Sequence, residues 1–182
     1  ATGLNLIFGV IKVVNFAHGQ LLMIGAYLTW TIAYASGLNA YAAIVVSMVI
    51  VALLGVVVER FTFRKVLGGD KLNEIFVSLG LIYIFENVAM LIWGTGSKQI
   101  VSPLSGLSLN LPSIAITYDR IVAVFVVIAT LVAFGLLIQK TKIGLAMRAT
   151  SQRNNTAMLM GINIEKIYML TFAIGAALAA VA

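Results

Sequence analysis

The 182-residue sequence contains no cysteine, a single histidine and only six acidic residues. Without cysteine the chain forms no disulfide and no thiolate metal site. His18 alone cannot supply a histidine-rich zinc site, and the HExxH pattern is absent. The six carboxylates are scattered between Glu59 and Glu165, so no catalytic carboxylate pair is evident. These absences argue against an enzyme, and we expect neither a metal nor another cofactor.

Charge is also scarce, because charged residues make up 10% of the chain and hydrophobic residues 62%. Soluble domains average about 25% charged and about 45–50% apolar residues. The mean hydropathy is +1.08. A soluble fold needs a polar exterior and could not hide this much apolar surface, whereas lipid removes that requirement. The net charge of +6 lies in short segments between apolar runs, so we expect membrane lipid and no nucleic acid as its partner.

The apolar residues gather into runs long enough to cross a bilayer, which needs about 20 helical residues. The runs lie at about 19–36, 40–58, 75–93 and 121–138, and a last run starts at Ile167. Backbone polar groups in lipid must be satisfied within a segment, so the runs are expected to be helices. The sequence therefore predicts an all-α, polytopic transmembrane helix bundle with about five spans, forming one domain over residues 1–182. Residues 94–119 are expected to form a loop.

The two ends of the sequence indicate a piece of a longer protein. The chain begins with Ala1 in place of methionine, and it ends at Ala182 inside an apolar run. Residues 3–11 are apolar and would be either the end of a truncated span or a half-helix.

Lysine and arginine alternate between the connections in a way that predicts topology. Segments 59–74 and 139–166 together hold nine of them, whereas segment 94–120 holds two and the turn at 37–39 holds none. Cytoplasmic loops carry the excess of basic residues, so 59–74 and 139–166 are expected in the cytoplasm of a multi-pass membrane protein.

The second basic segment carries its own structural signals. Residues 143–151 favour a helix, Asn154 or Asn155 is a candidate N-cap for a short helix over 156–160, and Gly161 suits the left-handed position after it. Asn163 could cap the next span. Methionine flanks Leu159 on both sides and would repack easily against a partner. Two interpretations remain open, namely an amphipathic segment resting on lipid headgroups and a docking element for a cytoplasmic protein.

Several motifs, in order, resemble the permeases of branched-chain amino acid ABC importers, the LivH/LivM type. The resemblance covers nearly the whole chain and is most specific near its two ends. The motifs are GLxLIFGV (3–10), VNFAHG (14–19), GAY (25–27), GL (80–81), LIWG (91–94), RA (148–149), AxLMGIN (157–163) and TFxIGAAxA (171–179).

The resemblance implies a transport subunit that has no ATPase site of its own. The segment around 140–163 would be the coupling element, which seats in a groove of the ATPase; the residues mapped onto it are Gly144, Arg148, Ala157, Leu159 and Gly161. The implied partners are cytoplasmic ATP-binding subunits, a second homologous permease subunit, an extracytoplasmic solute-binding protein and a small amino-acid substrate. Relatives with this signature also serve urea and short amides, so that substrate class stays an alternative.

A translocation path is the second candidate site. Asn15, His18 and Gly19 break an apolar run, which is typical either of an interrupted helix at a substrate site or of an ordinary helix start capped by Asn15. Glu86, beside Asn87, lies within a span and would either pair with another helix or line the path.

Other transport and packing hypotheses also follow from the sequence. A stand-alone proton-coupled transporter could use Glu86, although it would leave the long basic loop without a role. Residues 94–98 resemble a phosphate loop but miss the GxxxxGK[ST] pattern. Gly175 and Ala179 provide a small-residue face that is expected as generic span packing more than as a dimer seam.

Overall fold

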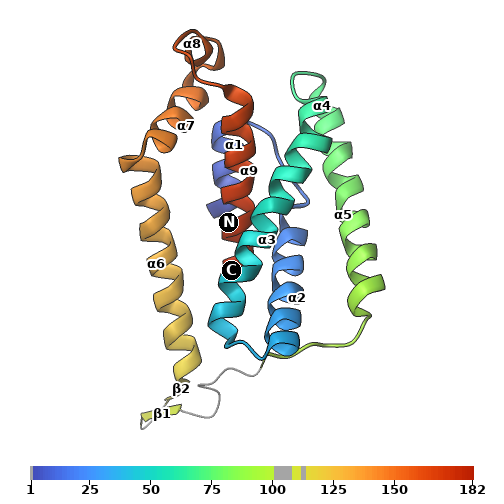
Figure 1. Ribbon diagram of the computed structural model, residues 1–182, viewed down its shortest axis with the longest axis vertical. Coiled ribbons are helices and arrows are strands. Elements are labelled where there is room, and N and C mark those ends of the chain that lie inside the picture. Colours follow the sequence, from blue (N-terminus) through green and yellow to red (C-terminus); the bar gives the residue numbers. More distant parts are fainter. Residues whose placement is uncertain (1, 101–107, 112–113) are drawn as a thin grey trace.

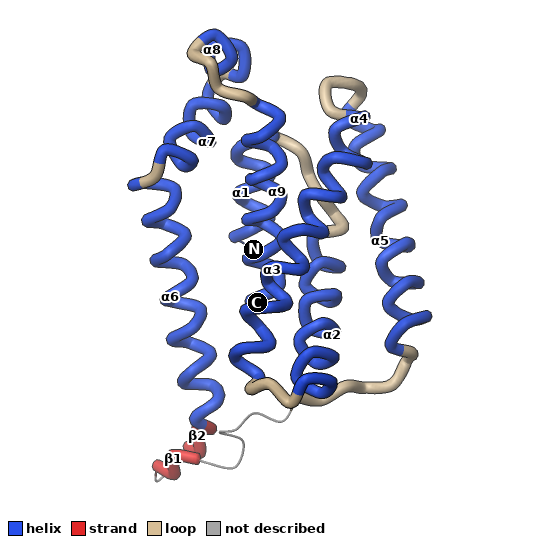
Figure 2. The backbone as a smooth tube through the Cα atoms, in the orientation of Figure 1, coloured by secondary structure: helices blue, strands red, loops and turns tan. Residues whose placement is uncertain are grey.

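The computed structural model describes residues 2–100, 108–111 and 114–182, and it is a bundle of long helices (Figures 1 and 2). Four helices among these residues are long and apolar enough to cross a membrane. They are Ala40–Val66, Lys71–Trp93, Tyr118–Lys140 and Ile164–Val181. The predicted all-α membrane bundle is therefore confirmed.

The two helices predicted in the uncharged region form where the sequence placed them. Helix α2 covers His18–Ser36 and helix α3 covers Ala40–Val58. Gly37 closes α2 with a φ of 62°, which is the left-handed conformation that glycine adopts without strain. The Asn39 side chain accepts a hydrogen bond from the Tyr41 amide at 3.3 Å and caps α3. Helix α2 is absent from the apolar candidates above because polar and aromatic side chains dilute it.

The charged segment 59–74 is more helical than expected. After α3 the chain continues as a π-helix, Glu59–Phe63, and as α4, Arg64–Val66, before it turns into α5, Lys71–Trp93. The prediction of a charged connection was wrong for residues 59–66, because burial of Glu59 lets the helix run on through charged residues.

The prediction of a loop over 94–119 also needs correction. Within it, strands β1 (Ser108–Leu111) and β2 (Ile114–Thr117) pair in antiparallel fashion, with Ser108 opposite Thr117. Helix α6, Tyr118–Lys140, then starts directly after β2. The C-terminal end of α5 contacts α2, because the Trp93 indole stacks on the Tyr27 ring with 5.1 Å between the ring centroids.

The remaining helices are α7 (Lys142–Gln152), α8 (Asn154–Leu159), α9 (Ile164–Val181) and, at the start of the chain, the short α1 (Thr2–Ile11). Figure 1 places α7, α8 and the turn after α4 at one end of the bundle, and the hairpin and the α2–α3 turn at the other. Both basic segments therefore share one end, as the alternation of charge required.

Helix α9 forms the centre of the bundle and packs against α1, α2 and α3. Its small residues Gly175, Ala176, Ala179 and Ala180 are buried. A Cβ atom added to Gly55 of α3 would lie 2.7 Å from the Ala176 Cβ atom, so these helices meet backbone to backbone. The small-residue face therefore packs within the chain.

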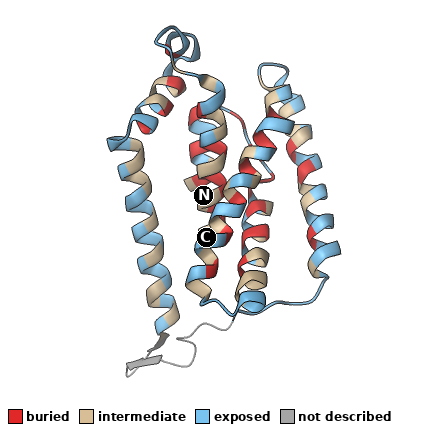
Figure 3. Cartoon of the chain, viewed as in Figure 1, coloured by how far each residue is buried: buried red, intermediate tan, exposed pale blue. Residues whose placement is uncertain are grey.

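Burial decreases from this centre toward α6 (Figure 3). Within the described residues, α6 contains none that is buried, and its Phe134 and Ile138 only partly cover the core. Gly3, Gly25 and Gly55 let α1, α2 and α3 approach small residues of α9 closely, whereas α6 stands beside the bundle and leaves hollows between itself and α1.

Candidate functional site

A non-helical segment inside the bundle joins α1 to α2 (Figure 2). Helix α1 ends at Ile11, Lys12 has a φ of 64°, and α2 begins only at His18. Between them burial alternates along the chain, because Val13, Asn15 and Ala17 face the core while Val14 and Phe16 are exposed. This period of two is typical of an extended strand. In Figure 1 the chain turns back after α1, so α1 and α2 run in opposite directions and are not two halves of one helix. A substrate site at this segment stays a prediction.

Asn15 and His18 place polar atoms in the buried part of this segment. The Asn15 side-chain oxygen accepts a hydrogen bond from the Ala17 amide at 3.0 Å, so Asn15 stabilises a turn before α2. The N-cap position of α2 is Ala17, and no side chain caps the helix there. The Asn15 Nδ2 and His18 Nδ1 atoms are buried and have no hydrogen-bond partner among the described residues. Unpaired buried polar atoms are rare enough to require an explanation.

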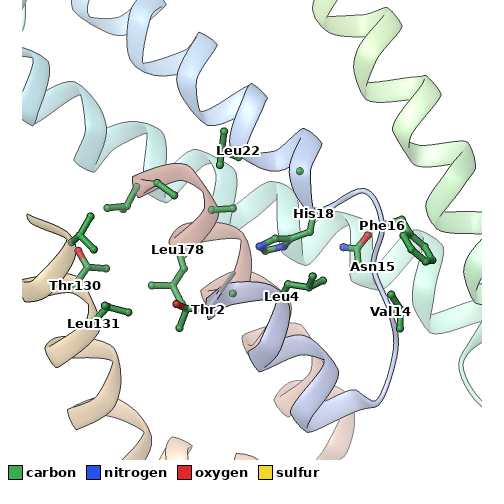
Figure 4. Close-up of a pocket in the computed structure, with 16 residues that line it drawn as sticks. Thr2, Leu4, Val14, Asn15, Phe16, His18, Leu22, Thr130, Leu131 and Leu178 are labelled. Atoms are coloured by element: carbon green, nitrogen blue, oxygen red, sulfur yellow. The ribbon is translucent and has the colours of Figure 1, made fainter. Parts of the chain in front are cut away.

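Asn15 and His18 line a cavity of about 440 Å³ between α1, α2, α6 and the end of α9, although their unpaired nitrogen atoms have almost no accessible surface. In Figure 4 the Asn15 amide nitrogen points toward His18, and Thr130 and Leu131 of α6 lie on the opposite side of the cavity. Gly19 also lines it. The lining residues are Thr2, Gly3, Leu4, Val14, Asn15, Phe16, His18, Gly19, Leu22, Val127, Thr130, Leu131, Leu178, Ala179, Val181 and Ala182.

Two further cavities continue along α1 toward the basic end. One of about 400 Å³ lies between α1, α6 and α7 and shares Thr2 with the first. The other, of about 410 Å³, shares Val10 and Ser151 with the second and is bordered by Lys12. The hollows thus follow α1 from the Asn15 cavity to the α7–α8 segment.

Glu86 and Asn87 lie elsewhere. Both are exposed on the outer face of α5, and neither borders the three cavities. The Asn87 amide donates to the carbonyl oxygen of Tyr83 at 2.8 Å. No described residue forms a hydrogen bond or an ion pair with the Glu86 carboxylate. The structure therefore brings Asn15, His18 and Gly19 together and leaves Glu86 and Asn87 apart from them.

Helix α7 is fixed to the bundle by one face. Its Thr141 cap accepts a hydrogen bond from the Gly144 amide at 3.1 Å, which the sequence reading missed. A Cβ atom added to Gly144 would collide with the backbone of Ile138, so α6 turns into α7 only with glycine there. Met147 and Thr150 are fully buried, whereas Arg148 points to the exposed side.

Helix α8 instead presents apolar side chains outward. Ala157 is 3% exposed, but the exposed fractions of Met158, Leu159 and Met160 are 57%, 88% and 79%. We call these three residues the apolar knob. Gly161 follows with a φ of 79°, as predicted for the left-handed position. The Asn163 side chain accepts from the Lys166 amide at 3.0 Å and caps α9, also as predicted.

The predicted capping of α8 was wrong. The helix begins at Asn154, its N-cap position is Arg153, and no side chain caps it. The Asn154 amide donates to the Tyr168 hydroxyl at 2.8 Å instead, because α9 lies beside α8 and offers a tertiary partner.

The sequence analysis did not predict a network of ion pairs that joins the end of α3 to the start of α9. The Arg64 guanidinium bonds the Glu59 carboxylate through Nε at 3.3 Å and through Nη2 at 3.0 Å. Its Nη1 atom bonds Glu165, in the first turn of α9, at 3.1 Å. The Glu59 side chain is fully buried. The only signal in the sequence is an acid and a base five residues apart, which is not a helical pairing distance and becomes one through the π-helix.

The whole chain, residues 1–182, matches the family described as branched-chain amino acid transport system / permease component. Similar proteins include the high-affinity branched-chain amino acid transport system permease proteins BraD of Pseudomonas aeruginosa, 31% identical, and LivH of Escherichia coli K12, 32% identical. Each alignment covers 100% of this chain and 63% of the relative. A probable branched-chain amino acid transport permease protein LivH of Methanocaldococcus jannaschii is 28% identical, over 100% of this chain and 59% of the relative.

No solved structure matches the chain at a significant level. The chain spans less than two thirds of the length of these relatives, and the match to the family extends from its first residue to its last. With the apolar helices, this match describes a multi-pass membrane protein. The chain belongs to the family of branched-chain amino acid transport system permease components.

Proposed function

We propose that this chain is part of the membrane-spanning permease of an ATP-driven importer, which moves branched-chain or related hydrophobic amino acids across the inner membrane. The observation that carries the proposal is the apolar knob of Met158, Leu159 and Met160 at the basic end of the bundle. The positive-inside rule assigns that end to the cytoplasm. Clustered apolar side chains exposed outside the lipid are typical of a protein-binding surface.

The rest of the α7–α8 segment supports a mechanical role for this surface. Gly144 and the buried residues Met147 and Ala157 fix the segment to the bundle, so it can act as a rigid body. Arg148 lies on the exposed side. A pair of cytoplasmic ATPase subunits that grips the knob would transmit nucleotide-driven closure to the helices as a rigid-body movement.

The other components of the assembly follow from the same proposal. A homologous second permease subunit would complete the membrane part, and an extracytoplasmic binding protein would deliver the substrate. The names of the similar proteins supply the substrate class, since they are permeases of high-affinity branched-chain amino acid transport systems. Leucine uptake by the reconstituted assembly, measured with and without ATP, tests the proposed function against the alternatives. A proton-coupled transporter would import leucine without ATP, and a transporter of urea or short amides would not import leucine.

A charge in the knob tests its role as the docking surface. Leu159→Asp should abolish ATP-dependent uptake and co-purification of the ATPase subunit, while insertion and the folded helices persist, because the side chain is 88% exposed. Leu72→Asp is the matched control, since Leu72 is 62% exposed in α5, whose first turn lies at the same end. Equal loss, or equal retention, of ATPase binding in the two variants would contradict the proposal.

Gly161 tests the geometry of the same element. Its φ of 79° strains any residue with a Cβ atom, although no atom lies within 4 Å of the position that the Cβ atom would take. Gly161→Val should therefore reorient the knob and abolish transport without disturbing packing in the membrane. Normal leucine uptake by a correctly inserted Gly161→Val protein would refute coupling at this loop.

A further inference from the structure

The cavity of about 410 Å³ at the joint between α7 and α8 is polar and basic. Its charged side chains are Lys12, which follows α1, and Arg153, which lies between α7 and α8. No acidic residue lines it, and Val10 is its apolar member. The neutral polar residues of its wall are Thr150, Ser151, Gln152, Asn154, Asn155 and Thr156. The cavity therefore suits a negatively charged ligand with several hydrogen-bond acceptors.

Neither cation is neutralised within the described part of the chain. Both ion pairs found there involve Arg64, which does not border the cavity. Lys12 and Arg153 come from segments far apart in the sequence, and the fold brings the two like charges to one cavity. Like charges that share a cavity repel each other, and a bound anion would replace this repulsion by attraction.

The backbone at Lys12 is an unusual place for a lysine. Its φ of 64° is in the left-handed region, and Lys12 is the only residue other than glycine with a positive φ among those that the structure describes. Glycine adopts this conformation without strain, whereas a Cβ atom makes it unfavourable. Strained residues of this kind concentrate at functional sites. A ligand that needs the lysine charge would explain a basic residue at a position that favours glycine.

An apolar groove continues from the basic cavity. This hollow of about 400 Å³ lies between α1, α6 and α7 and shares Val10 and Ser151 with the cavity. Gly9 of α1 and Gly135 of α6 line the groove, and no neighbouring helix has an atom within 4 Å of where their Cβ atoms would be. A free phosphate ion needs no such groove, whereas the acyl chain of a phospholipid does.

The two hollows also lie at the depths that the two parts of a phospholipid require. Helix α6 is an apolar span that ends at Lys140, and the groove extends along its last turns, between Phe134 and Gln139. Helix α7 starts just beyond the span, at Lys142, and its end borders the basic cavity. Acyl chains lie beside an apolar span, and headgroups lie where the span ends.

We propose that the two hollows hold one anionic phospholipid at the cytoplasmic end of the bundle. Lys12 and Arg153 bind its phosphate, Gln152 and Asn155 donate hydrogen bonds to the headgroup, and one acyl chain lies in the groove between α1 and α6. Basic pockets between membrane helices on the cytoplasmic side are typical sites for anionic headgroups. The lipid would join α6 to the rest of the bundle. This inference goes beyond the proposed function, and its test needs neither ATP nor an amino acid.

Native mass spectrometry of the full-length protein in detergent tests the basic cavity. The protein is titrated with palmitoyl-oleoyl phosphatidylglycerol and, separately, with the phosphatidylcholine of the same acyl chains. Lys12→Gln/Arg153→Gln should raise the apparent Kd for phosphatidylglycerol by at least about tenfold, because each cation near an anionic headgroup contributes about a fivefold factor. The Kd for phosphatidylcholine should change far less, since that lipid has no net charge.

The matched control removes the same two residue types at the same end of the bundle. Arg60 and Lys65 are exposed and border none of the three cavities. Arg60→Gln/Lys65→Gln should therefore bind phosphatidylglycerol like the parent. Equal weakening by the two double variants would show general attraction to the basic end and would overturn the site, and so would parent-like binding by Lys12→Gln/Arg153→Gln.

Lys12→Gly separates the charge from the folding of the segment. Glycine relieves the strain at a φ of 64°, so this variant should unfold no more easily than the parent. It should nevertheless bind phosphatidylglycerol about fivefold more weakly, because one cation is lost. Parent-like affinity in this stably folded variant would contradict the role of Lys12 at the phosphate.

Gly135→Leu tests the groove and distinguishes a lipid from a free phosphate. The new side chain should fill the groove and weaken phosphatidylglycerol binding by about tenfold or more. Gly80→Leu should bind like the parent, because Gly80 has equally open surroundings on α5 but borders none of the three cavities. Inorganic phosphate should not displace the lipid. Parent-like binding by Gly135→Leu, or displacement of the lipid by inorganic phosphate, would assign the cavity to a free anion and overturn the lipid site.

Discussion

Removal of Arg64 should destabilise the protein strongly, because its partner Glu59 is buried. The Glu59 side chain has no exposed surface, and two of the three Arg64 bonds go to it. Loss of one partner of a buried ion pair costs about 3–5 kcal/mol, because the remaining charge is left uncompensated. Arg64 itself keeps 28% of its side chain exposed, so water can reach the pair. We therefore expect Arg64→Ala to lower the free energy of unfolding by about 3 kcal/mol, the lower end of that range.

The outer half of the network should contribute much less. Glu165 is 71% exposed, and exposed ion pairs stabilise proteins by about 0–1 kcal/mol. Glu165→Gln should therefore cost less than about 1 kcal/mol. The double variant Glu59→Met/Arg64→Met removes both buried charges at once, and it should be more stable than Arg64→Ala, because apolar residues can replace a buried pair at little cost.

Reversible unfolding in mixed detergent, followed by circular dichroism and tryptophan fluorescence, measures the free energy of unfolding of the parent protein and of the three variants. An Arg64→Ala variant within about 0.5 kcal/mol of the parent would refute the argument, since this is the usual range for surface substitutions. So would a double variant no more stable than the single one, because the uncompensated Glu59 charge would then not be the cause.

Two further predictions concern helix contacts. Gly55→Val should destabilise the bundle by about 1–3 kcal/mol through overpacking, because the new Cβ atom would lie 2.8 Å from the Phe172 carbonyl oxygen. Gly80→Val should not destabilise it, because the surroundings of Gly80 are open. Thermal melting in detergent compares the two variants. Thr29→Val removes the buried 2.7 Å hydrogen bond to Ser47 and should cost about 0.6 kcal/mol in the same assay. A loss above about 2 kcal/mol would exceed what single bonds between membrane helices contribute and would indicate wider repacking.

The membrane helices were predictable because their signal is strong and local. Charge-free runs and turn residues such as Gly37 and Asn39 placed α2 and α3 at the residues observed. The roles of Gly161 and Asn163 were predictable for the same reason. A left-handed position and an N-cap each depend on one residue type and on the adjacent backbone.

Other features depend on contacts that no local pattern encodes. Asn154 looked like an N-cap, but its amide bonds Tyr168 on the neighbouring helix instead. The π-helix at Glu59–Phe63 exists together with the buried bond from Glu59 to Arg64, and hydropathy cannot reveal it because charge in a sequence normally marks a connection. Tertiary packing decided both cases.

The candidate path was predictable only in part for a similar reason. Asn15, His18 and Gly19 are close in sequence, so their gathering at one cavity needed only a non-helical connection between α1 and α2. Glu86 was selected for its position within a span, but depth in the membrane does not specify which side of a helix a residue occupies. The structure places it on the outer face of α5.

The central position of α9 has a mechanical consequence. This helix follows Gly161 after only two residues, and its buried glycine and alanine residues bring it close to α1, α2 and α3. The Phe172 ring of α9 also packs against Phe63, with ring centroids 5.0 Å apart. Close packing of this kind transmits a displacement of one helix directly to its neighbours. A displacement of α8 would therefore reach the helices around the Asn15 cavity through α9 alone. Movement of this one helix would widen or narrow the cavity.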